Sequence, residues 1–346
     1  MSDNIDALLR DLSEGDRELR RAAENSLVTL GGQAIDRLLL HAGDNAPTPL
    51  RRRVEAVLKR IDVDAVPRLR QIRQEGPGEL RSLALKVLVD AGGAAALGIA
   101  DRHAVERLLR IKLKDQHPVK LPSEAGRWLA FPADRLDTVV STLGLHDLQA
   151  ITSTAGIAAA TEFTDALKVE DAQAETQTVY RVYITPEITS WRAALDPEDD
   201  NVSTPRFTTW RLLWGNSYLD ERDGFTLADR VSERCGEAHF YLTDPYNSAE
   251  NWYVSRNGHP VRGFSTHAFP QFSGDPLPFE IEYRQDAVDE EEAEEYAQGV
   301  PYALTAADNL SIEPGSVLPR DTRGHGWLAT THPDLSNLHF KGALPL

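Results

Sequence analysis

The sequence lacks several features that would define a class of protein. Its 346 residues contain one cysteine, Cys235, so an internal disulfide and the multi-thiolate ligand sets of structural zinc sites are excluded. No run of about 18 uncharged apolar residues occurs, which predicts that the chain does not span a membrane. The first six residues include Asp3 and Asp6, whereas a secretory signal begins with basic residues that are followed by an apolar stretch. We therefore expect a cytoplasmic protein.

Signatures of catalysis are also missing. The chain has no glycine-rich phosphate loop of the Walker or dinucleotide type, no His-Glu-x-x-His motif and no serine nucleophile elbow. Cys235 lies where a helix is expected to end, and the helix dipole there disfavours a thiolate. We interpret Cys235 as a small buried thiol. No cofactor and no metal site are predicted, and a non-enzymatic function is favoured.

Charge is unevenly distributed along the chain. The formal net charge is −17, from 37 basic and 54 acidic side chains. Residues 1–100 contain 15 of each kind, so residues 101–346 carry 22 − 39 = −17. An acidic surface repels phosphate backbones and attracts basic proteins, so this half of the chain disfavours nucleic acid and favours a basic partner. Solubility alone is the alternative explanation of the acidic surplus.

The first part of the chain contains an internal repeat. Three segments that begin with Leu-Arg, at Leu19, Leu50 and Leu80, align at shifts of 31 and 30 residues and carry apolar residues at helical spacing. A short break and a second apolar helix pattern follow each segment. Because one helical hairpin cannot bury its apolar face alone, we predict a short α-solenoid over residues 1–116.

The wording of these repeats, for example Asp16-Arg-Glu-Leu-Arg-Arg-Ala-Ala23, resembles HEAT repeats. The resemblance implies a curved helical surface that binds other proteins. An arginine-rich run from Arg51 to Arg73 leaves nucleic-acid binding open as another interpretation. HEAT-like DNA glycosylases depend on aromatic side chains near the DNA, and this chain has no Trp, Tyr or Phe before Trp128.

The rest of the chain has the pattern of an α+β domain. From Arg127 onward, short segments with alternating apolar and polar residues replace the helical pattern. We predict a mostly antiparallel sheet with helices on one face over residues 117–300, and a Pro/Gly-rich tail, residues 301–346, packed on that domain. Residues 286–295 are mostly acidic and are interpreted as a solvated helix, because the glycine and spacing of a calcium loop are missing.

One β-hairpin is strongly indicated. Asn257-Gly258 favours a type I′ turn between two alternating segments, which places Tyr253 opposite Arg262. A further strand, residues 237–243, alternates in the same way. If this strand and the hairpin are neighbours, polar side chains gather on one face of the sheet. The candidate binding residues are Glu237, His239, Tyr241, Tyr253, Arg262 and Arg211.

This polar group supports two interpretations. Its arginines can bind a carboxylate or phosphate, and His239 can act as a general base oriented by Glu237 or Tyr241. The other interpretation is the solvated face that antiparallel sheets often have. Phrases such as Trp210-Arg-Leu-Leu-Trp-Gly215 make residues 101–335 resemble uncharacterised actinobacterial proteins, and this resemblance implies no reaction.

We therefore expect a non-enzymatic protein–protein interaction module with a basic partner. A bacterial immunity or antitoxin-like protein is one form of it, because an acidic surface steers quickly onto a basic toxin. The alternative is an enzyme or small-ligand-binding protein that uses the polar face around His239 and Arg262.

Overall fold

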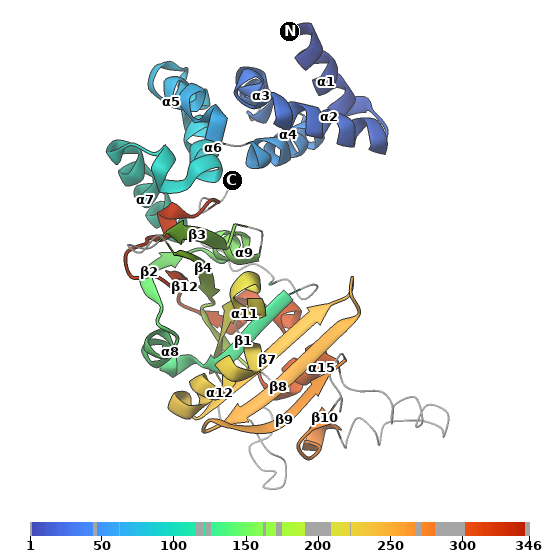
Figure 1. The fold of residues 1–346 in the computed structure, drawn as a ribbon, viewed down its shortest axis with the longest axis vertical. Coiled ribbons are helices and arrows are strands. Elements are labelled where there is room, and N and C mark those ends of the chain that lie inside the picture. Colours follow the sequence, from blue (N-terminus) through green and yellow to red (C-terminus); the bar gives the residue numbers. More distant parts are fainter. Residues whose placement is uncertain are drawn as a thin grey trace. The chain divides into compact units, whose positions relative to one another are not determined.

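A computed structural model describes residues 2–43, 47–61, 63–114, 121, 126–161, 164–170, 175–190, 209–221, 223–266, 272–280 and 302–342. The chain divides into two compact units, each visible in Figure 1. The helical unit contains residues 1–109 and 338–346, and the sheet unit contains residues 110–337. The predicted fold class is confirmed, because helical repeats precede a large antiparallel sheet with helices.

The helical unit reproduces the predicted period. Its helices are α1 (Ser2–Glu14), α2 (Arg17–Leu30), α3 (Ile35–Ala42), α4 (Thr48–Arg60), α5 (Val66–Glu75), α6 (Gly78–Ala96) and α7 (Ile99–Lys114). Helices α2, α4 and α6 begin at residues 17, 48 and 78, so their starts are 31 and 30 residues apart. Equivalent apolar residues Leu27, Leu58 and Leu88 are buried where α2 packs on α4 and α4 packs on α6.

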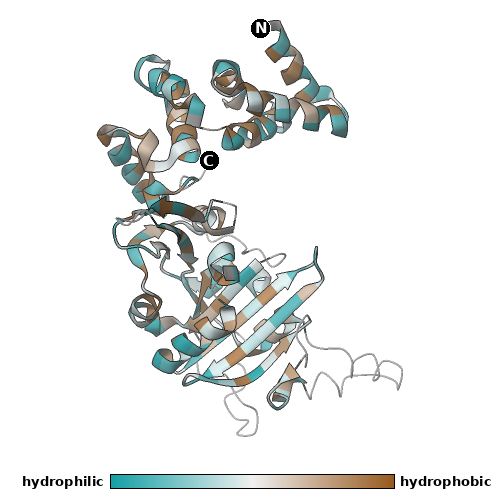
Figure 2. Cartoon of the chain, viewed as in Figure 1, coloured by the Kyte–Doolittle hydropathy of each residue, from teal (hydrophilic) through white to brown (hydrophobic). Residues whose placement is uncertain are grey.

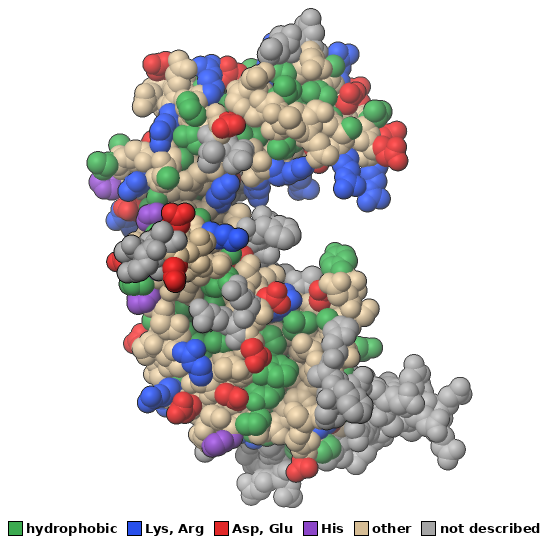
Figure 3. Space-filling view, viewed as in Figure 1, with side chains coloured by type: hydrophobic (Ala, Val, Ile, Leu, Met, Phe, Trp, Pro, Cys, Tyr) green, Lys and Arg blue, Asp and Glu red, His purple; other side chains and the backbone are tan. Residues whose placement is uncertain are grey.

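Arginines join neighbouring hairpins of the helical unit. Arg53 donates to the backbone carbonyls of Leu12 and Ser13, and Arg70 donates to those of Ala95 and Ala96. Arg68 donates to the carboxylate of Asp36, and Arg73 donates to that of Asp101. These distances are 2.6–2.9 Å. Figure 3 shows basic and acidic side chains together on the upper part of this unit and several Lys and Arg side chains along its lower edge in this view. The arginine-rich run therefore makes contacts between helices, which weakens the case for nucleic-acid binding.

A glycine kink in α6 receives the C-terminal segment. Gly93 has φ +54°, a left-handed conformation that favours glycine. A Cβ atom at Gly93 would lie 2.6 Å from the His339 carbonyl oxygen and 2.8 Å from that of Leu338. Phe340 is buried in the same unit. Within the predicted tail, residues 338–346 therefore belong to the helical unit.

The sheet unit is built on one large antiparallel sheet. Its strands are β1 (Gly126–Pro132), β2 (His146–Ile151), β3 (Ala166–Glu170), β4 (Thr176–Ile184), β5 (Glu187–Thr189), β6 (Thr209–Trp214), β7 (Glu237–Asp244), β8 (Ala249–Arg256), β9 (His259–Ser265), β10 (Phe272–Ser273), β11 (Thr322–Arg323) and β12 (Gly326–Thr330). The main order is β10-β9-β8-β7-β1-β6-β4-β12-β2. Strand β12, from the predicted tail, lies inside the sheet between β4 and β2.

Helices cover both faces of the sheet, and not one face only. One face, which we call the helix face, packs on α8 (Leu136–Leu143), α11 (Asn216–Glu221) and α12 (Gly224–Cys235). The strand residues Leu129 and Phe240 lie on this face. The other face packs on α9 (Ser153–Thr161) and α15 (Ala303–Leu310). Figure 1 shows α12 and α15 on opposite sides of β7 and β8. Figure 2 shows hydrophobic and hydrophilic residues alternating along these strands.

A row of aromatic residues runs across the second face, which we call the aromatic face. Successive strand partners in register are Tyr183, Trp214, Trp128, Tyr241, Trp252, Phe264 and Phe272. Trp128 stacks on Trp214 and on Tyr241, with ring centroids 5.6 and 5.2 Å apart. All seven except Phe272 are buried. This face is therefore a second dry core rather than the solvated face of the alternative interpretation.

Candidate functional site

Strand β7 brings three of the six predicted site residues together. Alternation along the strand places Glu237, His239 and Tyr241 on the aromatic face, while Ala238 and Phe240 lie on the helix face. The three polar side chains are almost completely buried, with exposed fractions of 1%, 1% and 0%. Buried polar groups of this kind require partners, and each has one.

The partners form a continuous hydrogen-bonded chain. Arg256 Nε donates to Glu237 Oε1 at 2.8 Å, and the same oxygen lies 3.1 Å from His239 Nε2. The Tyr241 hydroxyl lies 3.2 Å from His239 Nδ1 and 2.9 Å from Ser311 Oγ. We call these five residues the β7 relay. It leads from Arg256, which is partly exposed, to Ser311 directly after α15.

Charge and burial fix the ionisation of two members of this chain. Burial raises the pKa of Glu237, but His239 and Arg256 outweigh it and hold the pKa at about 2, so the carboxylate is ionised at neutral pH. Burial raises the pKa of Tyr241, so the phenol stays protonated. The direction of the bonds from Tyr241 to His239 and to Ser311 depends on which ring nitrogens of His239 carry hydrogen.

Tyr253 does not join this group. The β8–β9 register shifts between Val254 and Ser255, so Tyr253 lies opposite Gly263 and Val254 lies opposite Arg262. The predicted pairing of Tyr253 with Arg262 is therefore wrong by one residue. Tyr253 lies on the helix face, where its ring stacks on Phe225 at 4.4 Å and its hydroxyl donates to Asp229 at 3.0 Å.

Both predicted arginines have other partners. Arg211 lies on the side of β6 opposite to Trp210, and its guanidinium donates to the Thr185 carbonyl at 2.7 Å and to Glu187 at 3.3 Å. Arg262 shares the aromatic face with His239 but donates to both carboxylate oxygens of Glu280, at 3.0 and 2.7 Å. Neither guanidinium is directed at the β7 relay.

Cys235 is a buried thiol, as predicted. It lies at the end of α12 in the core of the helix face. Burial raises its pKa to about 11, which suppresses the reactive thiolate. It has no role in the β7 relay.

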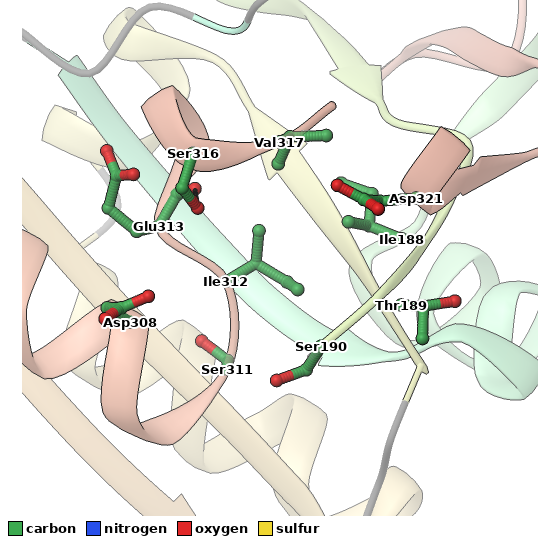
Figure 4. Close-up of a pocket in the computed structure, with 10 residues that line it drawn as sticks. All are labelled: Ile188, Thr189, Ser190, Asp308, Ser311, Ile312, Glu313, Ser316, Val317 and Asp321. Carbon is green, nitrogen blue, oxygen red and sulfur yellow. Dashed lines mark hydrogen bonds between the residues drawn. The ribbon is translucent and has the colours of Figure 1, made fainter. Parts of the chain in front are cut away.

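A small pocket adjoins the relay, and no periodic pattern in the sequence indicates it. Ser311 lines this pocket together with residues 188–190 at the end of β5 and residues 308–321 after and within α15 (Figure 4). Its volume is about 70 Å³. Cavities that enclose whole metabolites measure about 300–1,000 Å³, so this one has room only for a small group. Its polar side chains are hydroxyls and carboxylates.

Among the described residues no group of three or more His, Cys, Asp or Glu side chains is placed to hold a metal ion. No helix in the part of the chain that the structure describes has the length and apolar character needed to cross a membrane. The acidic run at residues 286–295 lies outside the described residues.

Comparison of the chain with models of protein families, with curated proteins and with solved structures finds no match.

Proposed function

We propose that this chain is a protein-binding module that recognises a basic partner. The observation that supports it best is the position of the basic side chains in the sheet unit. Arg211, Arg256 and Arg262 pair with Glu187, Glu237 and Glu280. Because each pair is neutral as a whole, the charge of −17 on residues 101–346 resides on the remaining side chains. That surplus attracts a basic protein.

The helical unit supports a binding role in a different way. Its arginines hold helices together, and several of its apolar side chains face solvent: Leu19, Leu40 and Ile99 are 51–76% exposed. Apolar side chains on a stack of helices supply contact area for a protein partner. Apolar side chains carry no charge with which to bind a phosphate backbone.

The enzymatic alternative has less support. The candidate residues His239 and Arg262 do not converge, and the β7 relay is covered by the segment that follows α15. An immunity or antitoxin-like role is the more specific form of our proposal. It rests on charge, since an acidic surface speeds association with a basic toxin.

The test is identification of the partner followed by kinetics. The full chain is used as bait in a lysate of its source cells, and the recovered partner is purified. We expect a basic protein whose association rate constant falls at least about tenfold between low and physiological ionic strength. A partner that is acidic or neutral, a rate that ignores salt, or recovery of no specific partner would overturn the proposal.

A further inference from the structure

An open groove of polar side chains lies between α8 and α12, and we call it the α8–α12 groove. The two helices pack side by side on the helix face of the sheet (Figure 1). The groove measures about 430 Å³, which is within the range of about 300–1,000 Å³ for small-molecule sites. Its lining residues in the described part of the chain are all polar: Thr138, Ser141, Thr142, Arg230, Glu233 and Arg234. A lining of this kind suits a ligand that is polar throughout.

Two arginines of α12 give the groove positive charge. Arg230 and Arg234 are one helical turn apart, so their like charges lie on the same side of the helix and repel each other. Within the described residues neither has a carboxylate partner. Six other arginines of the sheet unit lie 2.7–3.7 Å from a carboxylate oxygen: Arg127, Arg135, Arg211, Arg256, Arg262 and Arg320. An anion in the groove would relieve the repulsion between Arg230 and Arg234.

Helix α8 supplies hydroxyl groups across the groove. Thr138 and Thr142 are also one turn apart and share one side of their helix. Among the described residues neither hydroxyl has a hydrogen-bond partner, so both can donate to a ligand. Arg230 Nη2 donates to the Thr142 carbonyl at 2.8 Å, which holds this guanidinium against α8 and leaves its other N–H groups available. Two guanidiniums and two hydroxyls therefore line the groove as donors.

This set of donors suits a phosphate group better than a carboxylate. A phosphate monoester has a charge of about −1.5 to −2 at neutral pH and three acceptor oxygens. A carboxylate has a single charge and two oxygens. Guanidinium groups bind phosphate oxygens through pairs of parallel hydrogen bonds, and the threonine hydroxyls can donate to the oxygen that remains.

The groove also contains two acceptors that a bare phosphate does not use. Ser141 Oγ donates to the Thr138 carbonyl at 2.9 Å, so toward a ligand it can only accept. Glu233 is a carboxylate and accepts as well. A Cβ atom at Gly258 would lie 3.2 Å from Glu233 Cβ, so Glu233 leaves α12 beside the β8–β9 turn, whereas Arg230 reaches α8. Acceptors beside a phosphate site suit a ligand whose body carries hydroxyl groups.

We propose that the α8–α12 groove binds a sugar phosphate. The two arginines and the two threonines hold the phosphate group, and hydroxyls of the sugar donate to Ser141 and Glu233. Two guanidiniums against one carboxylate leave the lining positive, although residues 101–346 carry −17 overall. Salt screens exposed charges beyond about 8 Å, so the local charge decides whether a small anion binds. This site goes beyond the proposed protein-binding function and does not depend on it.

The first test measures the binding of small probes to the full chain by NMR titration at physiological ionic strength. The probes are glucose 6-phosphate, ribose 5-phosphate, inorganic phosphate and glucose. We expect at least one sugar phosphate to bind saturably in the millimolar range or tighter, inorganic phosphate to bind at least about threefold more weakly, and glucose at least about tenfold more weakly. Equal binding of glucose overturns the phosphate site, and equal binding of inorganic phosphate overturns the sugar. Failure of both sugar phosphates to saturate overturns the proposal.

A matched pair of variants locates the site. Arg234→Gln removes a guanidinium from the groove, and Arg323→Gln removes one from an exposed position on β11 that does not line it. Both variants have the same net charge. We expect Arg234→Gln to weaken binding of the tighter sugar phosphate at least about fivefold and Arg323→Gln to leave it within about twofold. Equal effects overturn the groove as the site, and thermal midpoints verify folding of both variants.

The variant Glu233→Gln tests the sugar end of the groove. It removes the negative charge that opposes an anion, so inorganic phosphate should bind at least about twofold more tightly. The amide also offers a weaker acceptor to a sugar hydroxyl than the carboxylate does, so the preference for sugar phosphate over inorganic phosphate should fall. Weaker binding of inorganic phosphate, or an unchanged preference, overturns this placement of the sugar phosphate.

Discussion

The charge of Glu237 should control the acid stability of the sheet unit. The ordinary pKa of this carboxyl is 4.5, and in the folded chain it is about 2. The difference of about 2.5, at about 1.4 kcal/mol per pKa unit, corresponds to about 3 kcal/mol. Because the folded pKa is depressed, this contribution is complete above about pH 4.5 and disappears as the pH falls toward 2.

Tryptophan fluorescence measures the sheet unit alone. All six tryptophans lie between residues 128 and 327, whereas the helical unit contains residues 1–109 and 338–346. Urea titrations of wild type and Glu237→Gln from pH 7 to pH 2 give the free energy of unfolding of each. At pH 7 the variant should be less stable by about 3 kcal/mol, and the two curves should converge near pH 2.

The exposed Glu170→Gln variant is the control and should follow wild type at every pH. A gap between wild type and Glu237→Gln that stays constant down to pH 2 would show that the side chain acts through shape alone. Stability at pH 7 equal to wild type would show that Arg256 and His239 do not depend on this charge. Either result refutes a β7 relay organised by the Glu237 carboxylate.

Three further perturbations test other parts of the structure. Cys235, whose pKa burial raises to about 11, should react with a thiol reagent only after unfolding, and fast modification of the native chain would contradict its burial. Gly93→Ala should lower the thermal midpoint followed by far-UV circular dichroism, because a Cβ would lie 2.6 Å from the His339 oxygen; Gly98→Ala, with open space around it, should not. Arg262→Lys replaces a two-point contact with Glu280 by a single one and should cost about 1–3 kcal/mol in urea titrations, more than Arg256→Lys at its partly exposed site.

Local patterns predicted most of the strands and turns near the site. Alternation in β7 correctly grouped Glu237, His239 and Tyr241, because neighbouring side chains of a strand always point to opposite faces. The Asn257-Gly258 turn also forms, with φ +50° and +81°. The pairing beyond the turn was wrong, since Ser255 pairs with Pro260 while Val254 pairs with Arg262, which leaves Val261 as an extra residue. Such a bulge moves Tyr253 to the other face relative to Arg262.

The cover over the aromatic face had no local signal. Tyr241 and Ser311 are 70 residues apart in the chain, and the helix α15 that brings Ser311 to the sheet lies in the segment predicted to be a Pro/Gly-rich tail. Polar residues at alternate positions of β7 are equally compatible with a solvated face and with a buried hydrogen-bonded chain. Only the contact with a distant segment distinguishes the two cases, so alternation alone could not predict the buried chain.

The buried relay and the aromatic row depend on each other. Tyr241 belongs to both, because its ring stacks on Trp128 while its hydroxyl joins His239 to Ser311. Burial beside the aromatic row strengthens these hydrogen bonds and makes the loss of a partner costly. The relay thus fixes the segment after α15 on the sheet and holds Ser311 at the wall of the pocket. Residues whose types suggested catalysis therefore position the segment after α15 on the sheet.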